Sequence, residues 1–121
     1  MPPLQILIIE NEYLIAMDAE CILHGAIDCA VTIATLKNFH LVLVKEKFDV
    51  VLLDFGALPE PTAADIAEIS KCGAQLVFTT AYDAYAAGVP GFECTPVAIK
   101  PYQEGQLLNA VNLALAGQGR N

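Results

Sequence analysis

Eight residues in the middle of the chain, Asp49 to Gly56, restrict its possible folds more than any other stretch. Four consecutive branched apolar residues, Val50 to Leu53, lead directly into Asp54 and then into a glycine. A continuous apolar run that ends in turn residues is typical of a strand buried on both faces, as in a parallel sheet. Asp54 would then lie at the carboxyl end of the strand, where open α/β sheets bind their ligands. The alternative is that Asp54 only forms a turn, since aspartate is a favoured turn residue.

Strand-like runs alternate with helical patterns along the whole chain. The predicted strands are Leu4 to Ile9, Ile27 to Ile33, Asp49 to Asp54, Ala74 to Thr79 and Val97 to Ile99; the predicted helices are Tyr13 to Gly25, Leu36 to Phe48, the stretch from the candidate cap Thr62 to Lys71, and Gln103 to Ala116. This alternation predicts an α/β fold, a doubly wound five-stranded parallel sheet in three α/β/α layers. Glycines and prolines between residues 83 and 95 leave room only for a reduced fourth helix.

Length and charge exclude several classes of protein. A chain of 121 residues is the size of one domain, so we expect residues 1–121 to form a single domain without an output domain. Six basic against fourteen acidic residues argue against direct binding of nucleic acid, which needs clusters of lysine and arginine. No apolar run approaches the roughly 18 residues of a membrane span, and the amino-terminal residues contain no basic leader. We therefore expect a cytoplasmic protein that does not bind membranes.

The cysteines and histidines form no recognisable metal motif. Cys21, Cys29, Cys72 and Cys94 lie far apart, with no Cys-x-x-Cys pair and no histidine at zinc-ligand spacing. This pattern favours buried free thiols.

Polar residues follow four of the five predicted strands. They are Glu10 and Asn11, Asp54, Thr80, and Lys100. In a parallel sheet these residues meet at one edge, and together their types suit phosphoryl transfer to a carboxylate. Asp54 would be the nucleophile, while Lys100 and Thr80 would bind the phosphoryl oxygens.

The acidic residues of this set also predict a metal site. Two carboxylates about 4 Å apart repel by about 4 kcal/mol at an effective dielectric constant near 20, so the cluster needs a cation. Glu10, Asn11, Asp54 and the backbone carbonyl of Gly56 could hold Mg²⁺, which prefers oxygen ligands. Each residue alone has a structural alternative: Asn11 as a helix cap, Thr80 as a packed strand end, and Lys100 as an exposed lysine.

The sequence resembles the receiver (CheY-like) domain of bacterial two-component response regulators over essentially its whole length. The resemblance rests on the segments Ile6 to Glu12, Val51 to Asp54, Thr80-Ala81 and Lys100-Pro101-Tyr102. It implies a flavodoxin-like fold, a Mg²⁺ requirement, a cis Lys100-Pro101 bond, and phosphotransfer to Asp54 from the phosphohistidine of a sensor kinase or phosphotransfer protein. It also implies that the protein is not an enzyme beyond its own phosphorylation and dephosphorylation.

A narrower resemblance and two departures from the family pattern qualify this interpretation. The segment Phe78 to Tyr82 is similar to the motif of a receiver subfamily named for Phe-Ala-Thr-Gly-Tyr, in which the fourth helix is reduced. Asn11 replaces the usual second acidic residue, which weakens Mg²⁺ binding because an amide brings no charge. Val97 replaces the usual aromatic residue, so the usual coupling of that ring to Thr80 cannot occur. Tyr82, two residues after Thr80, is a candidate cover for the site.

Two functions follow. The first is a stand-alone phosphoacceptor that switches the binding of a downstream output protein, because a phosphoryl group adds about −1.5 to −2 charges at one strand end. The alternative is a degenerate receiver, a protein-interaction module that works without phosphorylation. Asn11 and Val97 favour the alternative, whereas intact Asp54, Thr80 and Lys100 favour the switch.

Overall fold

A five-stranded parallel sheet forms the centre of the molecule in the computed structural model, which describes residues 2–117. The elements in chain order are β1 (Leu4–Ile9), α1 (Tyr13–Ala26), β2 (Cys29–Ala34), α2 (Phe39–Leu43), β3 (Val50–Asp54), α3 (Ala63–Lys71), β4 (Gln75–Thr80), the 3₁₀ turn η1 (Asp83–Tyr85), β5 (Val97–Ile99) and α4 (Glu104–Ala116). The strand order is β2-β1-β3-β4-β5, and all four strand pairs are parallel. The predicted doubly wound fold is therefore confirmed.

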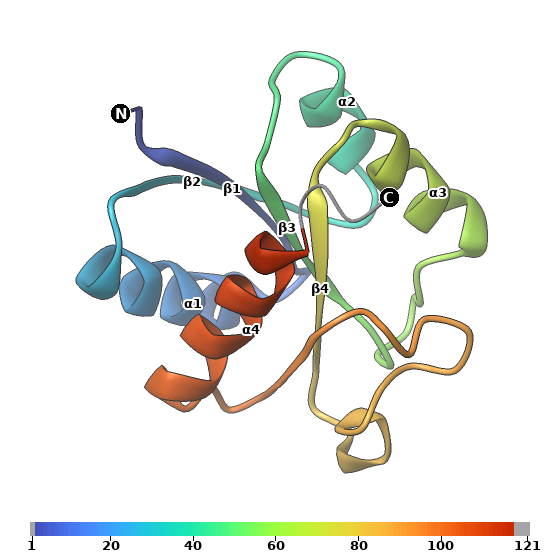
Figure 1. The fold of residues 1–121 in the computed structure, drawn as a ribbon. Helices are drawn as coiled ribbons and strands as arrows, with labels where there is room; N and C mark the ends of the chain where they lie inside the picture. Colours follow the sequence, from blue (N-terminus) through green and yellow to red (C-terminus); the bar gives the residue numbers. More distant parts are fainter. Residues whose placement is uncertain (1, 118–121) are drawn as a thin grey trace.

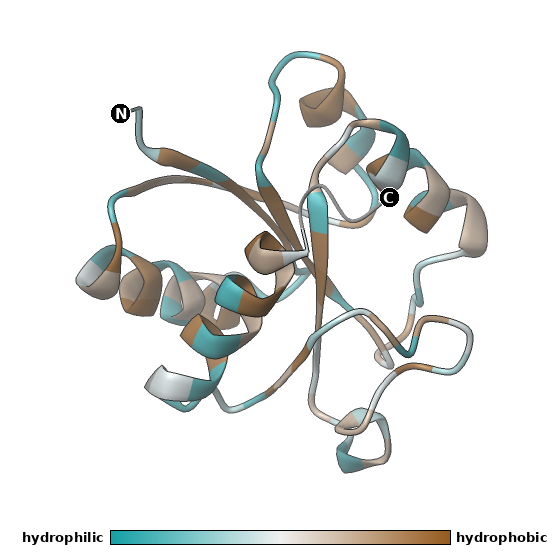
Figure 2. Cartoon of the chain, viewed as in Figure 1, coloured by the Kyte–Doolittle hydropathy of each residue, from teal (hydrophilic) through white to brown (hydrophobic). Residues whose placement is uncertain are grey.

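Helices cover both faces of the sheet (Figure 1), with α1 and α4 on one face and α2 and α3 on the other. Alternate residues of one strand belong to different cores: Val50 and Leu52 of β3 pack with the α1/α4 side, whereas Val51 and Leu53 pack with the α2/α3 side. All four side chains are fully buried. Figure 2 shows the central strands as mostly hydrophobic along their length. Burial on both faces explains why these strands are continuous apolar runs in the sequence.

The second helix is much shorter than predicted. Instead of Leu36 to Phe48, it covers only Phe39–Leu43. Its start is delayed because the Asn38 side chain accepts a hydrogen bond from the Thr35 backbone N–H at 2.9 Å, which makes a turn before the helix. Its end comes early where Val44 is 79% exposed, so no packing there offsets the low helix propensity of a β-branched residue.

The first helix also ends differently from the prediction. Gly25 does not terminate it; the helix continues to Ala26, and the Ile27 N–H closes its last turn on the Leu23 carbonyl. The second strand accordingly begins at Cys29 rather than at Ile27.

The region between β4 and β5 has the reduced helix that the sequence predicts. The turn η1 covers three residues, and the chain then forms a loop stabilised by an antiparallel bridge between Val89 and Phe92. Gly88 has a φ angle of +137°, a conformation that prevents a regular helix from passing through it. The loop residue Val89 is buried, so the loop packs against the sheet in the place of a helix.

The cysteines differ from the prediction in their burial. The cysteines are free, but only Cys29 is buried, whereas Cys21, Cys72 and Cys94 are exposed. The prediction of four buried thiols is therefore wrong for three of them, because Cys21 lies on an exposed side of α1, Cys72 directly follows α3, and Cys94 lies in the loop before β5. No helix within residues 2–117 is long and apolar enough to cross a membrane.

Candidate functional site

Four strands bring the predicted site residues to the carboxyl edge of the sheet. Asp54 is the last residue of β3, a central strand, and Thr80 is the last residue of β4 beside it. Glu10 directly follows β1 on the other side of β3, and Lys100 directly follows β5. The strands are parallel, so residues distant in the chain meet at this edge.

Lys100 joins the two carboxylates of the site. Its ammonium group donates a hydrogen bond to Asp54 Oδ1 at 2.7 Å and another to Glu10 Oε1 at 2.8 Å. The exposed fractions of the three side chains are 9% for Lys100, 13% for Asp54 and 2% for Glu10. The alternative of an exposed lysine is thus wrong. The Lys100-Pro101 peptide bond is cis, as the resemblance implies.

The same contacts set the protonation of Lys100. Burial by itself lowers the pKa of the ammonium group, but the hydrogen bonds to Asp54 and Glu10 and the charges of these carboxylates outweigh burial, so the pKa of Lys100 lies above its ordinary value. Lys100 therefore carries a full positive charge in the site at neutral pH.

Thr80, Gly56 and Tyr82 form one side of the site. Thr80 is fully buried, and its hydroxyl oxygen accepts a hydrogen bond from the Tyr82 backbone N–H at 3.1 Å. Gly56 has a φ angle of +100°, and a Cβ atom added to it would lie 2.6 Å from Cδ2 of Tyr82 and 3.1 Å from the Thr80 hydroxyl oxygen. Only glycine fits under the tyrosine ring here. The ring of Tyr82, which is 51% exposed, covers the backbone two residues after Asp54.

Asn11 does not cap the first helix. The N-cap position of α1 is Glu12, which makes no side-chain capping bond. The Asn11 side-chain oxygen instead accepts a hydrogen bond from the Leu36 backbone N–H at 3.0 Å, across 25 residues of sequence. Asn11 thereby ties the loop after β2 to the loop after β1. The alternative of Asn11 as a helix cap is wrong.

A small hollow separates Asn11 from the phosphoacceptor candidate. It is lined by Ile9, Asn11, Leu36, Asp54 and Pro59. Asn11 and Asp54 are candidates from the sequence alone, whereas Leu36 is not, because its hydrogen bond to Asn11 spans 25 residues. Glu12 was also missed: its backbone N–H donates to Glu10 Oε2 at 3.2 Å and so fixes that carboxylate.

The oxygen atoms around this hollow suit a hard divalent cation, although with little negative charge. Among residues 2–117 there is no cluster of three aspartate, glutamate, histidine or cysteine side chains that could hold a metal ion. Glu10 has one oxygen bound to Lys100 and the other to a backbone N–H. Asn11 Oδ1 is likewise bound to the Leu36 N–H and Asp54 Oδ1 to Lys100, so a cation here would share these oxygens with existing hydrogen bonds. The donors thus fit Mg²⁺ by type and predict weak binding by charge.

Comparisons with known proteins are consistent with this geometry. No protein-family model and no curated protein matches the sequence. Among solved structures, the chain is similar to the response regulator REC domain of PhyR from Erythrobacter litoralis, with 30% identity, a TM-score of 0.76, and coverage of 98% of this chain and 95% of that one. It is also similar to SdrG from Sphingomonas melonis, with 25% identity, a TM-score of 0.73, and coverage of 95% and 98%. The response regulatory domain of mrkE from Klebsiella pneumoniae shares the fold at 19% identity and a TM-score of 0.75, with coverage of 98% and 100%.

Proposed function

Because this chain belongs to the receiver-domain family of response regulators, we propose that it accepts a phosphoryl group onto Asp54 from the phosphohistidine of a sensor kinase or a phosphotransfer protein. We further propose that it acts as a stand-alone switch, whose phosphorylation changes its binding to an output protein. Receiver domains are phosphoacceptors rather than conventional enzymes, and they generally bind Mg²⁺. The observation that supports the proposal best is the Lys100 ammonium group, which binds Asp54 at the carboxyl edge of the sheet.

The proposed transfer uses the carboxylate of Asp54 as the nucleophile. Asp54 Oδ1 is held by Lys100, so the other oxygen, Oδ2, attacks the phosphorus atom. A P–O bond forms as the P–N bond of the donor breaks, and the leaving imidazole nitrogen keeps the electron pair and takes a proton from solvent. The product is an acyl phosphate on Asp54.

The neighbouring residues stabilise the charge of the transferred group. The Lys100 ammonium group pairs with a phosphoryl oxygen, and the Thr80 hydroxyl donates a hydrogen bond to another. When bound at Asp54, Asn11 and the Gly56 carbonyl, Mg²⁺ would neutralise the incoming phosphoryl charge. Glu10 keeps Lys100 in place through its own hydrogen bond.

The test measures phosphoryl uptake from acetyl phosphate by intact mass, with and without Mg²⁺. We expect a Mg²⁺-dependent adduct that is absent from Asp54→Ala. We expect Asn11→Asp to react several-fold faster, because aspartate can still accept the hydrogen bond from Leu36 and adds one negative charge for the metal. Asn38→Asp is a matched control: it changes charge in the same way and keeps an equivalent bond, to Thr35, outside the site.

The result that would overturn the proposal is also specific. If the wild type forms no adduct at any Mg²⁺ concentration while Asn11→Asp does, the chain works as an interaction module without phosphorylation. An adduct that persists in Asp54→Ala would mean that another residue is the acceptor.

A further inference from the structure

The outer edge of β5 offers free backbone hydrogen-bonding groups. Within residues 2–117, β5 is the last strand of the sheet and pairs only with β4. Pro96 accepts a bond from Phe78 N–H at 2.9 Å, and Lys100 N–H donates to the Thr80 carbonyl at 2.7 Å. In a parallel pair the bonded residues alternate, so the backbone N–H and C=O groups of Val97 and Ile99 point away from β4.

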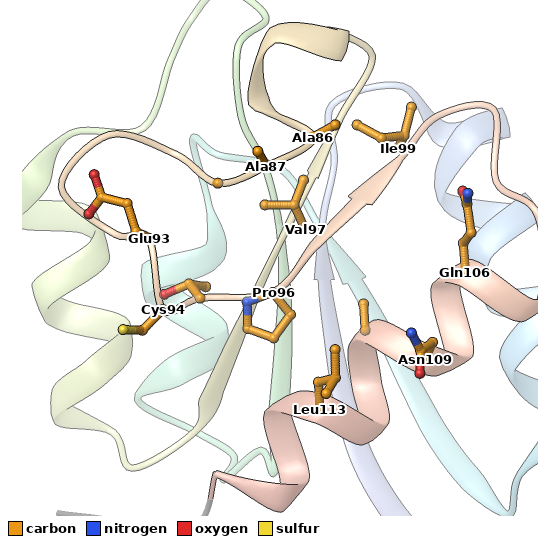
Figure 3. A pocket seen from close by; sticks show the side chains of 13 residues that line it. Ala86, Ala87, Glu93, Cys94, Pro96, Val97, Ile99, Gln106, Asn109 and Leu113 are labelled. Carbon is orange, nitrogen blue, oxygen red and sulfur yellow. The ribbon is translucent and has the colours of Figure 1, made fainter.

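A groove runs along this edge (Figure 3). It has a volume of about 550 Å³, and both Val97 and Ile99 line it. One wall is the loop of residues 86–95, and the other is the exposed side of α4. The groove exists because the chain between β4 and β5 forms a loop rather than a full helix, and this loop leaves the edge of β5 uncovered.

The two walls differ in chemistry. On the α4 wall, the amides of Gln106 and Asn109 lie above Leu113, which is 57% exposed. On the loop wall, the charged residue Glu93 lines the groove, and its carboxylate accepts a hydrogen bond from the Gly91 backbone N–H at 3.0 Å. This bond lowers the pKa of Glu93, so the carboxylate is ionised at neutral pH. The groove therefore combines unpaired backbone groups, an apolar anchor and one fixed negative charge.

We propose that this groove binds an extended segment of a partner protein, which adds to β5 as a sixth strand. Strand addition satisfies the free groups of Val97 and Ile99, and the three residues of β5 span about 10 Å, enough to pair three residues of the segment. An apolar residue of the segment packs on Leu113, and a lysine or arginine pairs with Glu93. A basic segment also suits the net charge of −8 on the chain. This binding goes beyond the proposed phosphoacceptor function and does not require phosphorylation of Asp54.

The test uses unphosphorylated protein and a library of displayed seven-residue random peptides. We expect selection of sequences that combine β-branched and basic residues. A synthetic peptide from the selection should shift the NMR signals of residues 86–99 and slow hydrogen exchange at the Val97 and Ile99 amides at least tenfold. A selected peptide that shifts other surfaces and leaves these two amides unprotected would overturn the proposal, as would a library without binders.

Three variants separate this groove from other surfaces. Leu113→Asp should weaken peptide binding at least tenfold, whereas the control Leu41→Asp, at a similarly exposed leucine on α2, should leave it unchanged. Glu93→Lys should reverse the preference of the library from basic to acidic peptides. Sedimentation of the free protein tests whether a second copy of the chain fills the groove instead. A dimer that Leu113→Asp dissociates would show this and would overturn the proposal. Peptide binding of equal strength by all three variants would also overturn the proposal.

Discussion

At the scale of single residues, Tyr82 is the side chain whose position bears most directly on the lifetime of a phosphoryl group. Its ring lies against Gly56, two residues after Asp54, and its backbone is held by the Thr80 hydroxyl. A ring in this place limits the approach of water to an acyl phosphate on Asp54. We therefore expect Tyr82→Ala to lose the phosphoryl group several-fold faster than the wild type, in a decay followed by intact mass. Tyr82→Phe keeps the ring and should decay at the wild-type rate; equal rates for all three proteins would exclude a role for the ring.

Tyr102 makes stability depend on alkaline pH. Burial raises the pKa of its phenol to about 12, above the ordinary value of about 10. The unfolded chain therefore loses this proton first, and the stabilisation is complete below pH 10 and disappears as the pH rises to about 12. We expect the free energy of unfolding to fall by up to about 1.4 kcal/mol per pH unit in this window from Tyr102 alone. Urea unfolding between pH 9 and pH 11.5 measures it.

A comparison of variants assigns that loss to one residue. The pKa of Lys100 is also raised by its carboxylate partners, so Lys100 too loses stabilising charge at alkaline pH, and some slope should remain in Tyr102→Phe. The control Tyr82→Phe, at an exposed tyrosine, should keep the full slope. If the free energy of unfolding of Tyr102→Phe falls with pH as steeply as that of the wild type, the phenol of Tyr102 titrates alike in the folded and the unfolded chain.

The site residues could be predicted from the sequence where the signal is local. Asp54, Thr80 and Lys100 each end or follow a strand-like run, and a parallel sheet necessarily brings such positions together. The partner of Asn11 could not be predicted, because its bond to Leu36 spans 25 residues between two loops. The cover over Gly56 depends on the orientation of the Tyr82 ring, which only packing determines.

At the scale of elements, α3 begins with a complete capping box. The Thr62 hydroxyl accepts from the Asp65 N–H at 3.1 Å, and the Asp65 carboxylate accepts from the Thr62 N–H at 2.8 Å. We expect Thr62→Ala to lower the free energy of unfolding by about 1 kcal/mol, because alanine removes the hydroxyl that accepts from the Asp65 N–H. Urea unfolding with an unchanged m value measures the loss. Thr62→Ser keeps the hydroxyl and should stay within a few tenths of a kcal/mol of the wild type; an equal loss in both variants would assign the effect to the methyl group.

The accuracy of the predicted elements follows the strength of their local signals. The cap Thr62 was identifiable because threonine is followed three residues later by an acidic residue, and α3 begins where that pattern places it. The pattern for the second helix was misleading, since apolar spacing continues to Phe48 although the helix ends at Leu43. Phe48 lies just before β3 and is buried in the core on the α2/α3 side of the sheet. Its apolar side chain therefore packs where the chain enters the sheet and does not belong to a helix.

At the scale of the whole molecule, stability should be graded across the sheet. β1 and β3 each have a neighbouring strand on both sides, and their residues fill the cores on both faces. Exchange of the Ile8 and Leu52 amides with solvent therefore requires global unfolding, and we expect these amides to be among the slowest in the protein. The amides of Val97 and Ile99 point away from β4 at the open edge, so they should exchange much faster than those of the central strands.

Hydrogen exchange followed by NMR distinguishes an open edge from a covered one. If the Val97 amide exchanges as slowly as that of Leu52, another segment already occupies the edge of β5 in the free protein, and the groove is not available to a partner. If the Ala98 amide is protected while its neighbours on both sides are not, the alternation expected for a parallel edge strand is present. The Lys100 N–H continues this ladder to the Thr80 carbonyl, so a strand bound at β5 would directly adjoin the residue that holds Asp54. Binding at the groove and phosphorylation at the sheet edge would then act on the same short strand.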